Sequence, residues 1–278
     1  EGMEKLREGV IGDVYMARAP IFKIRGAIGN DEPKPAPKGL DWDAWLGPSP
    51  KHPYSTTRHR GWHYMWDTGC GQLGNQGVHQ MDLIRWGLGF KTHPNRVMSM
   101  GGHYTHDDAQ ETPDTQTCCF QWEGRDIFIE IQTRNWYTNT EARMGEKYPF
   151  VDNQSVCGII FLGTEGYMII PDYSSYLTFL GREREPGPSQ YLEGNPMMDT
   201  PHFRNWIEVV RSRKREDLFA DIEEGHLSAA LCHLGNIAYR TERAVHFDPK
   251  TERCIGDDEA NELLTRPPRE PYAIPENV

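Results

Sequence analysis

The sequence lacks a long apolar run, an excess of basic residues and a regularly spaced set of cysteines. No stretch of the 278 residues approaches the roughly 20 apolar residues that a membrane-spanning helix needs. The net charge of −11 argues against sequence-independent binding to nucleic acid and against binding to an anionic membrane surface. The six cysteines include no Cys-x-x-Cys spacing, so we expect neither a disulfide scaffold nor a structural zinc site.

The sequence also lacks the usual features of a protein N-terminus. The first nine residues read as the last turns of a helix whose beginning is absent, and no signal peptide precedes them. We therefore expect residues 1–9 to be the remnant helix of a domain that is missing from this chain. The whole chain, residues 1–278, is predicted to be a single domain. Its last part, residues 248–278, is rich in proline and charge and is expected to form an extended C-terminal arm.

A glycine-rich stretch from Gly69 to Gly74 matches the Gly-x-Gly-x-x-Gly pattern of dinucleotide-binding turns. That fingerprint also requires a strand before it, a second strand after the helix and an acidic residue about twenty positions on. Residues 62–67 are poorly strand-like, and residues 89–94 contain no Asp or Glu. The sequence therefore predicts no Rossmann domain and no cofactor-binding residue in this chain.

The segment after these glycines is patterned as a helix that ends near Gly89. Asn75, His79, Asp82 and Trp86 recur at i, i+4, i+7 and i+11, which places them on one stripe. Apolar residues surround the stripe, so we expect the imidazole and the carboxylate to sit where water is scarce. A His–Asp pair one turn apart is suited to proton transfer. The same pair is equally typical of a hydrogen bond inside a core, and this stretch alone does not separate the two interpretations.

Two loops carry further candidates. The loop at residues 58–66 interleaves basic and aromatic side chains, which could line a polyol pocket, although aromatic rings more often cover a sheet. The substrate-binding candidates in it are Arg60, Trp62 and Tyr64. A second loop carries side chains of metal-ligating type, namely His103, His106, Asp107 and Asp108. Adjacent donors on a loop more often face solvent, so we predict no metal site.

Strand patterns dominate residues 94–180, and Ile127, Ile129 and Ile131 alternate with bulkier or polar residues as in a sheet with one buried face. Hairpin turns are expected at residues 122–125 and 163–166, and a long polar loop at 134–155. Two helices follow. The first starts near Thr200 and has an apolar stripe formed by Phe203, Trp206, Ile207 and Val210. The second opens at Asp221, which forms a capping-box pattern with Glu224.

These motifs together resemble the C-terminal domain of the Gfo/Idh/MocA oxidoreductases, in a bacterial subgroup marked by the residues from Gly74 to Asp82. The resemblance covers nearly the whole chain. The supporting motifs are residues 9–14, 41–48, 111–116, 223–226 and 233–240.

The resemblance implies an α+β fold with a large, mostly antiparallel open sheet and helices packed on one face. The other face commonly forms the subunit contact, which implies a homo-oligomer. Full-length members add an N-terminal Rossmann domain and use NAD(P) to oxidise or reduce a hydroxyl carbon of a sugar, polyol or glycoside. His79 then looks like the catalytic histidine, and Asn75 stands where many members carry Asp. The lysine that these enzymes also use lies in the Rossmann domain and has no equivalent here.

The leading hypothesis is therefore the substrate-binding and oligomerisation domain of an NAD(P)-dependent oxidoreductase. In it, His79 is the general acid/base, Asp82 is its supporting partner and Asn75 hydrogen-bonds a small carbohydrate substrate. This chain alone is not expected to transfer a hydride. The alternative is a natural Rossmann-less member that acts as a carbohydrate-binding subunit or as a redox-neutral lyase or hydrolase. A purely structural sheet domain, the third hypothesis, predicts no pocket around His79.

Overall fold

The computed structural model describes residues 1–138, 155–192 and 199–273, and most of the loop predicted at 134–155 lies outside these ranges. Eleven strands of the described residues form one sheet. They are β1 (Val14–Lys23), β2 (Arg96–Gly102), β3 (Thr115–Gln121), β4 (Phe128–Arg134), β5 (Ser155–Cys157), β6 (Ile159–Gly163), β7 (Gly166–Ile170), β8 (Leu177–Leu180), β9 (Glu185–Pro186), β10 (Val245–Asp248) and β11 (Arg253–Cys254). Their order is β11-β10-β2-β3-β4-β1-β6-β7-β8-β9, and β5 pairs with β1.

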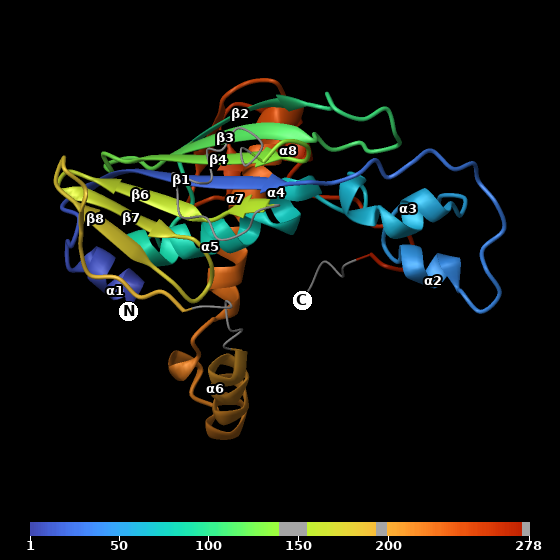
Figure 1. The fold of residues 1–278 in the computed structure, drawn as a ribbon. Coiled ribbons are helices and arrows are strands. Elements are labelled where there is room, and N and C mark those ends of the chain that lie inside the picture. The colour runs from blue at the N-terminus through green and yellow to red at the C-terminus, as the bar shows by residue number, and fades with distance from the viewer. Residues whose placement is uncertain (139–154, 193–198, 274–278) are drawn as a thin grey trace.

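Neighbouring strands in this sheet are antiparallel except for β1 and β4, which pair in parallel with Ala17 opposite Ile129. The described helices are α1 (Gly2–Arg7), α2 (Trp42–Leu46), α3 (Thr56–Arg60), α4 (Gly71–Asn75), α5 (Gly77–Leu88), α6 (Asp199–Ser212), α7 (Ile222–Arg240) and α8 (Asp258–Glu262), with 3₁₀ turns at Trp62–Tyr64 and Arg215–Asp217. Figure 1 shows α1, α5 and α7 below the sheet and α6 projecting away from it. The predicted α+β class, with an open and mostly antiparallel sheet, is confirmed. None of the described helices combines the length and the apolar character needed to cross a membrane.

Several helices begin at a residue whose side chain caps them. Asp41, Ser55, Asp221 and Asp257 each accept a hydrogen bond from a backbone N–H in the first turn of α2, α3, α7 and α8. The cap predicted at Asp221 is therefore present. The reciprocal half of the capping box is not seen, because the carboxylate of Glu224 instead pairs with Arg85 and Lys91.

The core lies between the sheet and helices α5 and α7. Ile129 and Ile131 of β4 are buried while their strand neighbours are less so, as expected of a sheet with one covered face. Gly235 of α7 sits so close to β3 that a methyl group there would lie 3.0 Å from the sulfur of Cys118. α7 therefore packs directly on the sheet, and α5 packs beside it.

The helix predicted around the Asn75–Trp86 stripe is interrupted. α4 ends at Asn75 and α5 begins at Gly77, with Gln76 between them. The end of α5 is as predicted, because Gly89 adopts φ +67, a left-handed conformation that favours glycine. The predicted hairpins are also confirmed, since the turns at 122–125 and 163–166 join the antiparallel pairs β3–β4 and β6–β7.

The C-terminal segment is less extended than predicted. It first completes the β10–β11 hairpin and then forms α8. Only beyond α8 does it run as an arm, where Arg266 donates to the carbonyl oxygens of Asp67 and Gly69 at 3.2 and 3.1 Å. The arm thus lies against the loop that leads into α4.

Candidate functional site

The glycines before α4 allow the chain to pack tightly. A methyl group at Gly69 would lie 2.3–2.5 Å from the backbone of His63, and Gly71 has φ +67 with Thr112 beside it. The residues ahead of Gly69 include a 3₁₀ turn, Trp62–Tyr64, where a dinucleotide fingerprint needs a strand. The Gly-x-Gly-x-x-Gly match is therefore explained by close packing of this loop.

The candidate stripe lies on the outer side of α4 and α5. Asn75, His79, Asp82 and Trp86 are all exposed, and the side chain of Asp82 is 54% accessible. The expectation that His79 and Asp82 sit where water is scarce is therefore wrong for the described chain. The apolar residues of α5 face the other way, and Met81 is fully buried. The periodicity correctly grouped the stripe on one face, but that face is turned away from the core.

Three segments meet around His79. Lys23 at the end of β1 donates from Nζ to Oε1 of Gln76 at 2.5 Å, and Nε2 of Gln76 donates to the hydroxyl of Tyr173 at 3.1 Å. The ring of Tyr173, in the loop between β7 and β8, lies 5.8 Å from the ring of His79 between centroids. Gln76, at the junction of α4 and α5, thus holds an ammonium group and a phenol beside the imidazole.

The electrostatics of this group favour a neutral imidazole. Partial burial lowers the pKa of His79 below its ordinary value, and the Lys23 ammonium lowers it further, while the Asp82 carboxylate raises it by less. Partial burial also raises the pKa of Tyr173, so its phenol keeps its proton. At neutral pH the site therefore offers a proton acceptor beside a protonated hydroxyl donor.

Asp82 is tied to α7. Its Oδ1 accepts a hydrogen bond from Oγ of Ser228 at 2.8 Å and lies 3.9 Å from the guanidinium of Arg85. No hydrogen bond joins Asp82 to His79 among the described side chains. Asp82 therefore acts on the imidazole through its charge and not as a hydrogen-bonded partner.

Arg85 was not singled out from the sequence, although it anchors α5. It is 2% exposed, and its guanidinium donates to the carbonyl of Phe90 at 3.0 Å, to Oγ of Ser228 at 2.7 Å and to both the carbonyl and the carboxylate of Glu224. Its position in the sequence could have indicated this role, because Arg85 shares the apolar face of the predicted helix with Met81 and Ile84. Ser228 also donates a hydrogen bond to Asp82. Arg85 therefore helps to hold Asp82, one residue of the candidate stripe, in place.

The substrate-binding candidates are separated. Trp62 is 47% exposed and Arg60 is exposed, whereas Tyr64 is 4% exposed and lies in the core. The backbone carbonyl of Tyr64 accepts hydrogen bonds from the amides of Glu111 and Thr112. Tyr64 is therefore placed as a packing residue of this lobe. Arg60 and Trp62 belong to the lobe of α2 and α3, which Figure 1 shows at the far end from β7 and β8.

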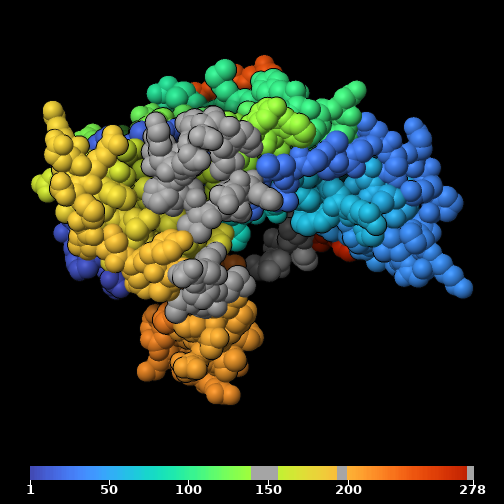
Figure 2. Space-filling model, viewed as in Figure 1, coloured from blue at the N-terminus to red at the C-terminus, as the bar shows by residue number. Residues whose placement is uncertain are grey.

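The molecule is hollowed below the sheet, between the yellow segment of β7 and β8 and the blue lobe of α2 and α3 (Figure 2). In the ribbon view, α4 and α5 lie between these two parts (Figure 1).

The loop at 103–108 does not gather its donors. His106 contacts the carbonyl of Arg25 through Nε2 at 3.0 Å, and the carboxylate of Asp108 accepts from the amides of Ile28 and Gln110. His103 lies 3.2 Å from Asp108. The side chains of His106 and Asp108 thereby hold the loop to the segment at Arg25 and Ile28.

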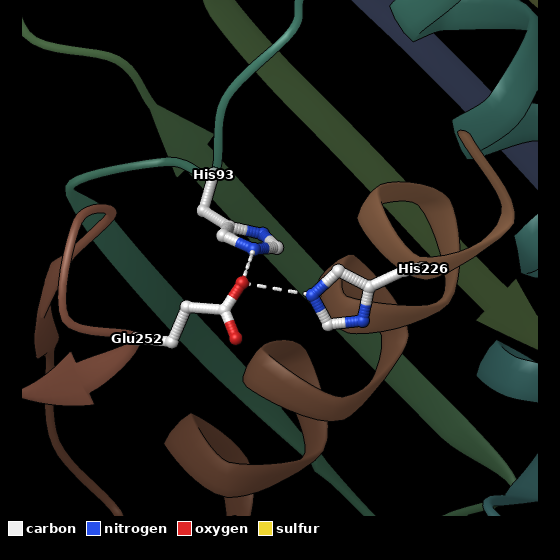
Figure 3. A group of neighbouring side chains, drawn as sticks. All are labelled: His93, His226 and Glu252. Atoms are coloured by element: carbon white, nitrogen blue, oxygen red, sulfur yellow. Dashed lines mark hydrogen bonds and ion pairs between the residues drawn. The ribbon is translucent and has the colours of Figure 1, made fainter. Parts of the chain in front are cut away.

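Metal-type donors converge elsewhere, at His93, His226 and Glu252 (Figure 3). This group could not be found from the sequence, because His93 and His226 lie 159 and 26 positions from Glu252. No ligand-spacing motif covers such separations.

Comparison with known proteins supports the fold. The family model that describes an oxidoreductase family, C-terminal alpha/beta domain, matches residues 22–139 and 185–274. No curated protein matches the sequence. Aldose-aldose oxidoreductase from Caulobacter crescentus, complexed with glycerol, has a TM-score of 0.59 at 12% identity, covering 89% of this chain and 59% of its own.

The WlbA dehydrogenase from Bordetella pertussis, in complex with NADH and UDP-GlcNAcA, has a TM-score of 0.53 at 17% identity, covering 88% of this chain and 58% of its own. Identities this low show the shared fold alone. The coverages of 58% and 59% show that the chain spans less than two thirds of the length of these solved proteins.

Proposed function

The chain belongs to the Gfo/Idh/MocA family of oxidoreductases, and from this premise we propose that it is the substrate-binding and oligomerisation domain of an NAD(P)-dependent enzyme. Its substrate would be a sugar, polyol or glycoside that reacts at a hydroxyl carbon. Support comes from two proteins of similar fold, a dehydrogenase bound to NADH and UDP-GlcNAcA and an aldose-aldose oxidoreductase complexed with glycerol.

The observation that carries the proposal is the surroundings of His79. The imidazole is accessible, its pKa is lowered, and it lies next to the ring of Tyr173. Oxidation of a carbinol removes a hydride from carbon and a proton from oxygen, and a neutral imidazole can accept that proton. We assign this role to His79.

The neighbouring side chains would orient the substrate. Asn75, one turn before His79, is exposed and offers both an amide donor and an acceptor to a sugar hydroxyl. The hydroxyl of Tyr173 and the ammonium of Lys23 are held beside the imidazole by Gln76. The charge of Asp82 would raise the pKa of His79 without a hydrogen bond between them. Arg60 and Trp62 remain proposed contacts for a larger substrate, whereas the burial of Tyr64 leaves its ring without access.

Among the residues that the structure describes, the glycine motif does not fit a dinucleotide. The only glycine motif of the right spacing packs against His63 and Thr112, and it follows no strand. We therefore assign no step in this chain to the nicotinamide, and we propose that NAD(P) is held by a domain outside it.

The open face of the sheet is the proposed contact between subunits. This face lies opposite the helices (Figure 1) and carries exposed apolar side chains, among them Met98 and Met100 of β2, which are 38% and 82% exposed. Exposed apolar side chains on the open face of a sheet are typical of a surface that is buried in an oligomer. Sedimentation of the wild type and of Met100→Asp tests this part of the proposal, and an unchanged oligomeric state would contradict it.

The catalytic assignment is tested in the complete enzyme with a panel of aldoses, polyols and UDP-sugars, each offered with NAD⁺ and NADP⁺. We expect His79→Ala to lower kcat by about 10²–10⁴-fold and to leave the circular dichroism spectrum unchanged, because the side chain is exposed. Turnover that survives this substitution would remove His79 from the mechanism. Sugar binding without any change of the nicotinamide would favour a carbohydrate-binding subunit.

A further inference from the structure

Three side chains from distant parts of the chain meet near the N-terminal end of α7. His93 lies in the loop between α5 and β2, His226 lies near the start of α7, and Glu252 lies in the turn between β10 and β11. Nε2 of each histidine is 2.8 Å from the same oxygen, Oε1 of Glu252. Figure 3 shows both imidazoles pointing toward this carboxylate.

The first imidazole is fixed by its burial. His93 is 3% exposed, and its ring meets the ring of Phe247 edge to face at 5.5 Å between centroids. Its Nδ1 has no hydrogen-bond partner among the described residues. Nε2 is therefore the atom through which this buried ring meets a polar partner, and that atom is directed at Glu252.

The carboxylate of Glu252 is positioned by a turn with a strained backbone. Glu252 has φ +53, a left-handed conformation that favours glycine. Asp248 fixes the turn, because its carbonyl accepts from the amide of Glu252 at 2.9 Å and its carboxylate accepts from the amide of Lys250 and the hydroxyl of Thr251. A glutamate thus occupies a position where the backbone alone would select glycine, and its side chain joins the two histidines.

We propose that His93, His226 and Glu252 form a binding site for a divalent transition-metal ion, with Zn²⁺ as the best fit. Two imidazoles and one carboxylate are a ligand set that zinc takes when three protein groups bind it and a fourth position stays open. The open position would face solvent, since the side chains of His226 and Glu252 are 53% and 50% exposed.

The three donor atoms all lie within 4.8 Å of one another, and the two distances from nitrogen to Oε1 need only a small change. Donors about 2.0–2.1 Å from a tetrahedral ion lie roughly 3.3 Å apart, so both nitrogens would retreat from Oε1 by about half an ångström. Each Nε2 would exchange its hydrogen bond for the metal, and each ring would carry its proton on Nδ1. The bound ion would tie the loop before β2, the start of α7 and the β10–β11 turn together.

The experiment measures Zn²⁺ binding to the purified, tag-free and metal-stripped chain by isothermal titration calorimetry, together with the thermal midpoint with and without Zn²⁺. The variants are His226→Ala and Glu252→Gly, which keep buried His93 in place, and glycine suits the φ of position 252. The matched control is His246→Ala, which removes an exposed histidine from the same hairpin.

We expect one Zn²⁺ per wild-type chain and a rise of the thermal midpoint. Affinity should fall at least tenfold in each of the two variants and stay within twofold in the control. His226→Ala leaves every surface carboxylate unchanged, so weak binding to such groups cannot explain a loss of affinity in that variant. The proposal is overturned if the wild type binds less than one ion per chain, or if its affinity is matched by either cluster variant.

Discussion

Asp82 and Ser228 are joined by a hydrogen bond of 2.8 Å between Oγ and Oδ1, which links the candidate stripe on α5 to the buried side of α7. Ser228 also accepts from the guanidinium of Arg85 at 2.7 Å. The carboxylate that sequence spacing pairs with His79 therefore completes a chain of hydrogen bonds leading into the core. The hydrogen bonds that hold α5 in place therefore involve Asp82 and do not involve the candidate imidazole of His79.

Substitution of Asp82 by asparagine should consequently affect the reaction only mildly. The Asp82 charge raises the pKa of His79, so Asp82→Asn should lower that pKa further while the amide oxygen still accepts from Ser228. We expect kcat/KM of the complete enzyme to fall by less than about tenfold, far less than for loss of a general base. A loss as large as that of His79→Ala would show that Asp82 takes part in proton transfer directly.

Replacing Arg85 by methionine should destabilise the fold severely. The guanidinium is buried and paired with Glu224, and removing one partner of such a pair typically costs about 3–5 kcal/mol. Lys91→Met is the matched control, because Lys91 binds the same carboxylate from an exposed position and should cost about 0–1 kcal/mol. Urea unfolding of the three proteins measures both values, and equal costs would refute the assignment of Arg85 as an anchor.

A pair of glycine substitutions tests the steric account of the glycine-rich loop. Gly69→Ala places a methyl group within 2.5 Å of backbone atoms of His63, which no rotamer change can relieve. We expect a loss of about 1–3 kcal/mol or more. A methyl group at Gly225, an exposed position of α7, would meet no atom within 4 Å, so Gly225→Ala should instead gain about 0.5–1 kcal/mol from helix propensity. Thermal unfolding compares the two variants, and similar shifts would contradict the packing argument.

Local patterns in the sequence predicted local structure well. The alternation around Ile129 and Ile131 predicted a strand with one buried face, and Gly89 predicted the end of α5. Asp221 predicted the start of α7. Each of these features depends on residues a few positions apart, so the information lies within the segment itself.

Features that depend on distant partners could not be predicted in this way. The period of a helix shows which residues share a face but not what that face contacts. The stripe of His79 and Asp82 therefore has the predicted grouping but is exposed. For the same reason, nothing in the sequence indicated that His93 and His226 would meet at Glu252.

Helix α6 tests whether a predicted apolar face is also a buried one. Its predicted apolar stripe exists, yet Phe203 and Trp206 are 58% and 56% exposed in the described chain. Trp206→Ser should therefore change the stability of this chain by no more than about 0.5 kcal/mol. Leu231→Ala on buried α7 should cost about 2–5 kcal/mol. Chemical denaturation measures both, and a large cost at Trp206 would mean that the stripe is packed in solution.

The protonation of His79 is the property on which the proposed chemistry depends, and it can be measured in this chain alone. Partial burial and the Lys23 ammonium lower its pKa below the ordinary value of about 6.5. The folded chain thus binds this proton less readily than the unfolded chain. The stability that results is fully present above pH 6.5 and is lost as the pH falls through the lowered pKa.

Lys23→Met removes the positive charge and should raise the pKa of His79 toward its ordinary value. In the complete enzyme, the fall of kcat/KM on the acid side should then begin at a higher pH. Lys38→Met, which removes an exposed lysine from a distant loop, is the control and should leave the titration unchanged. The pKa is followed by NMR from the imidazole C–H signals, with His79→Gln used to assign the resonance. An identical titration in wild type and Lys23→Met would mean that the ammonium group does not set the proton affinity of His79.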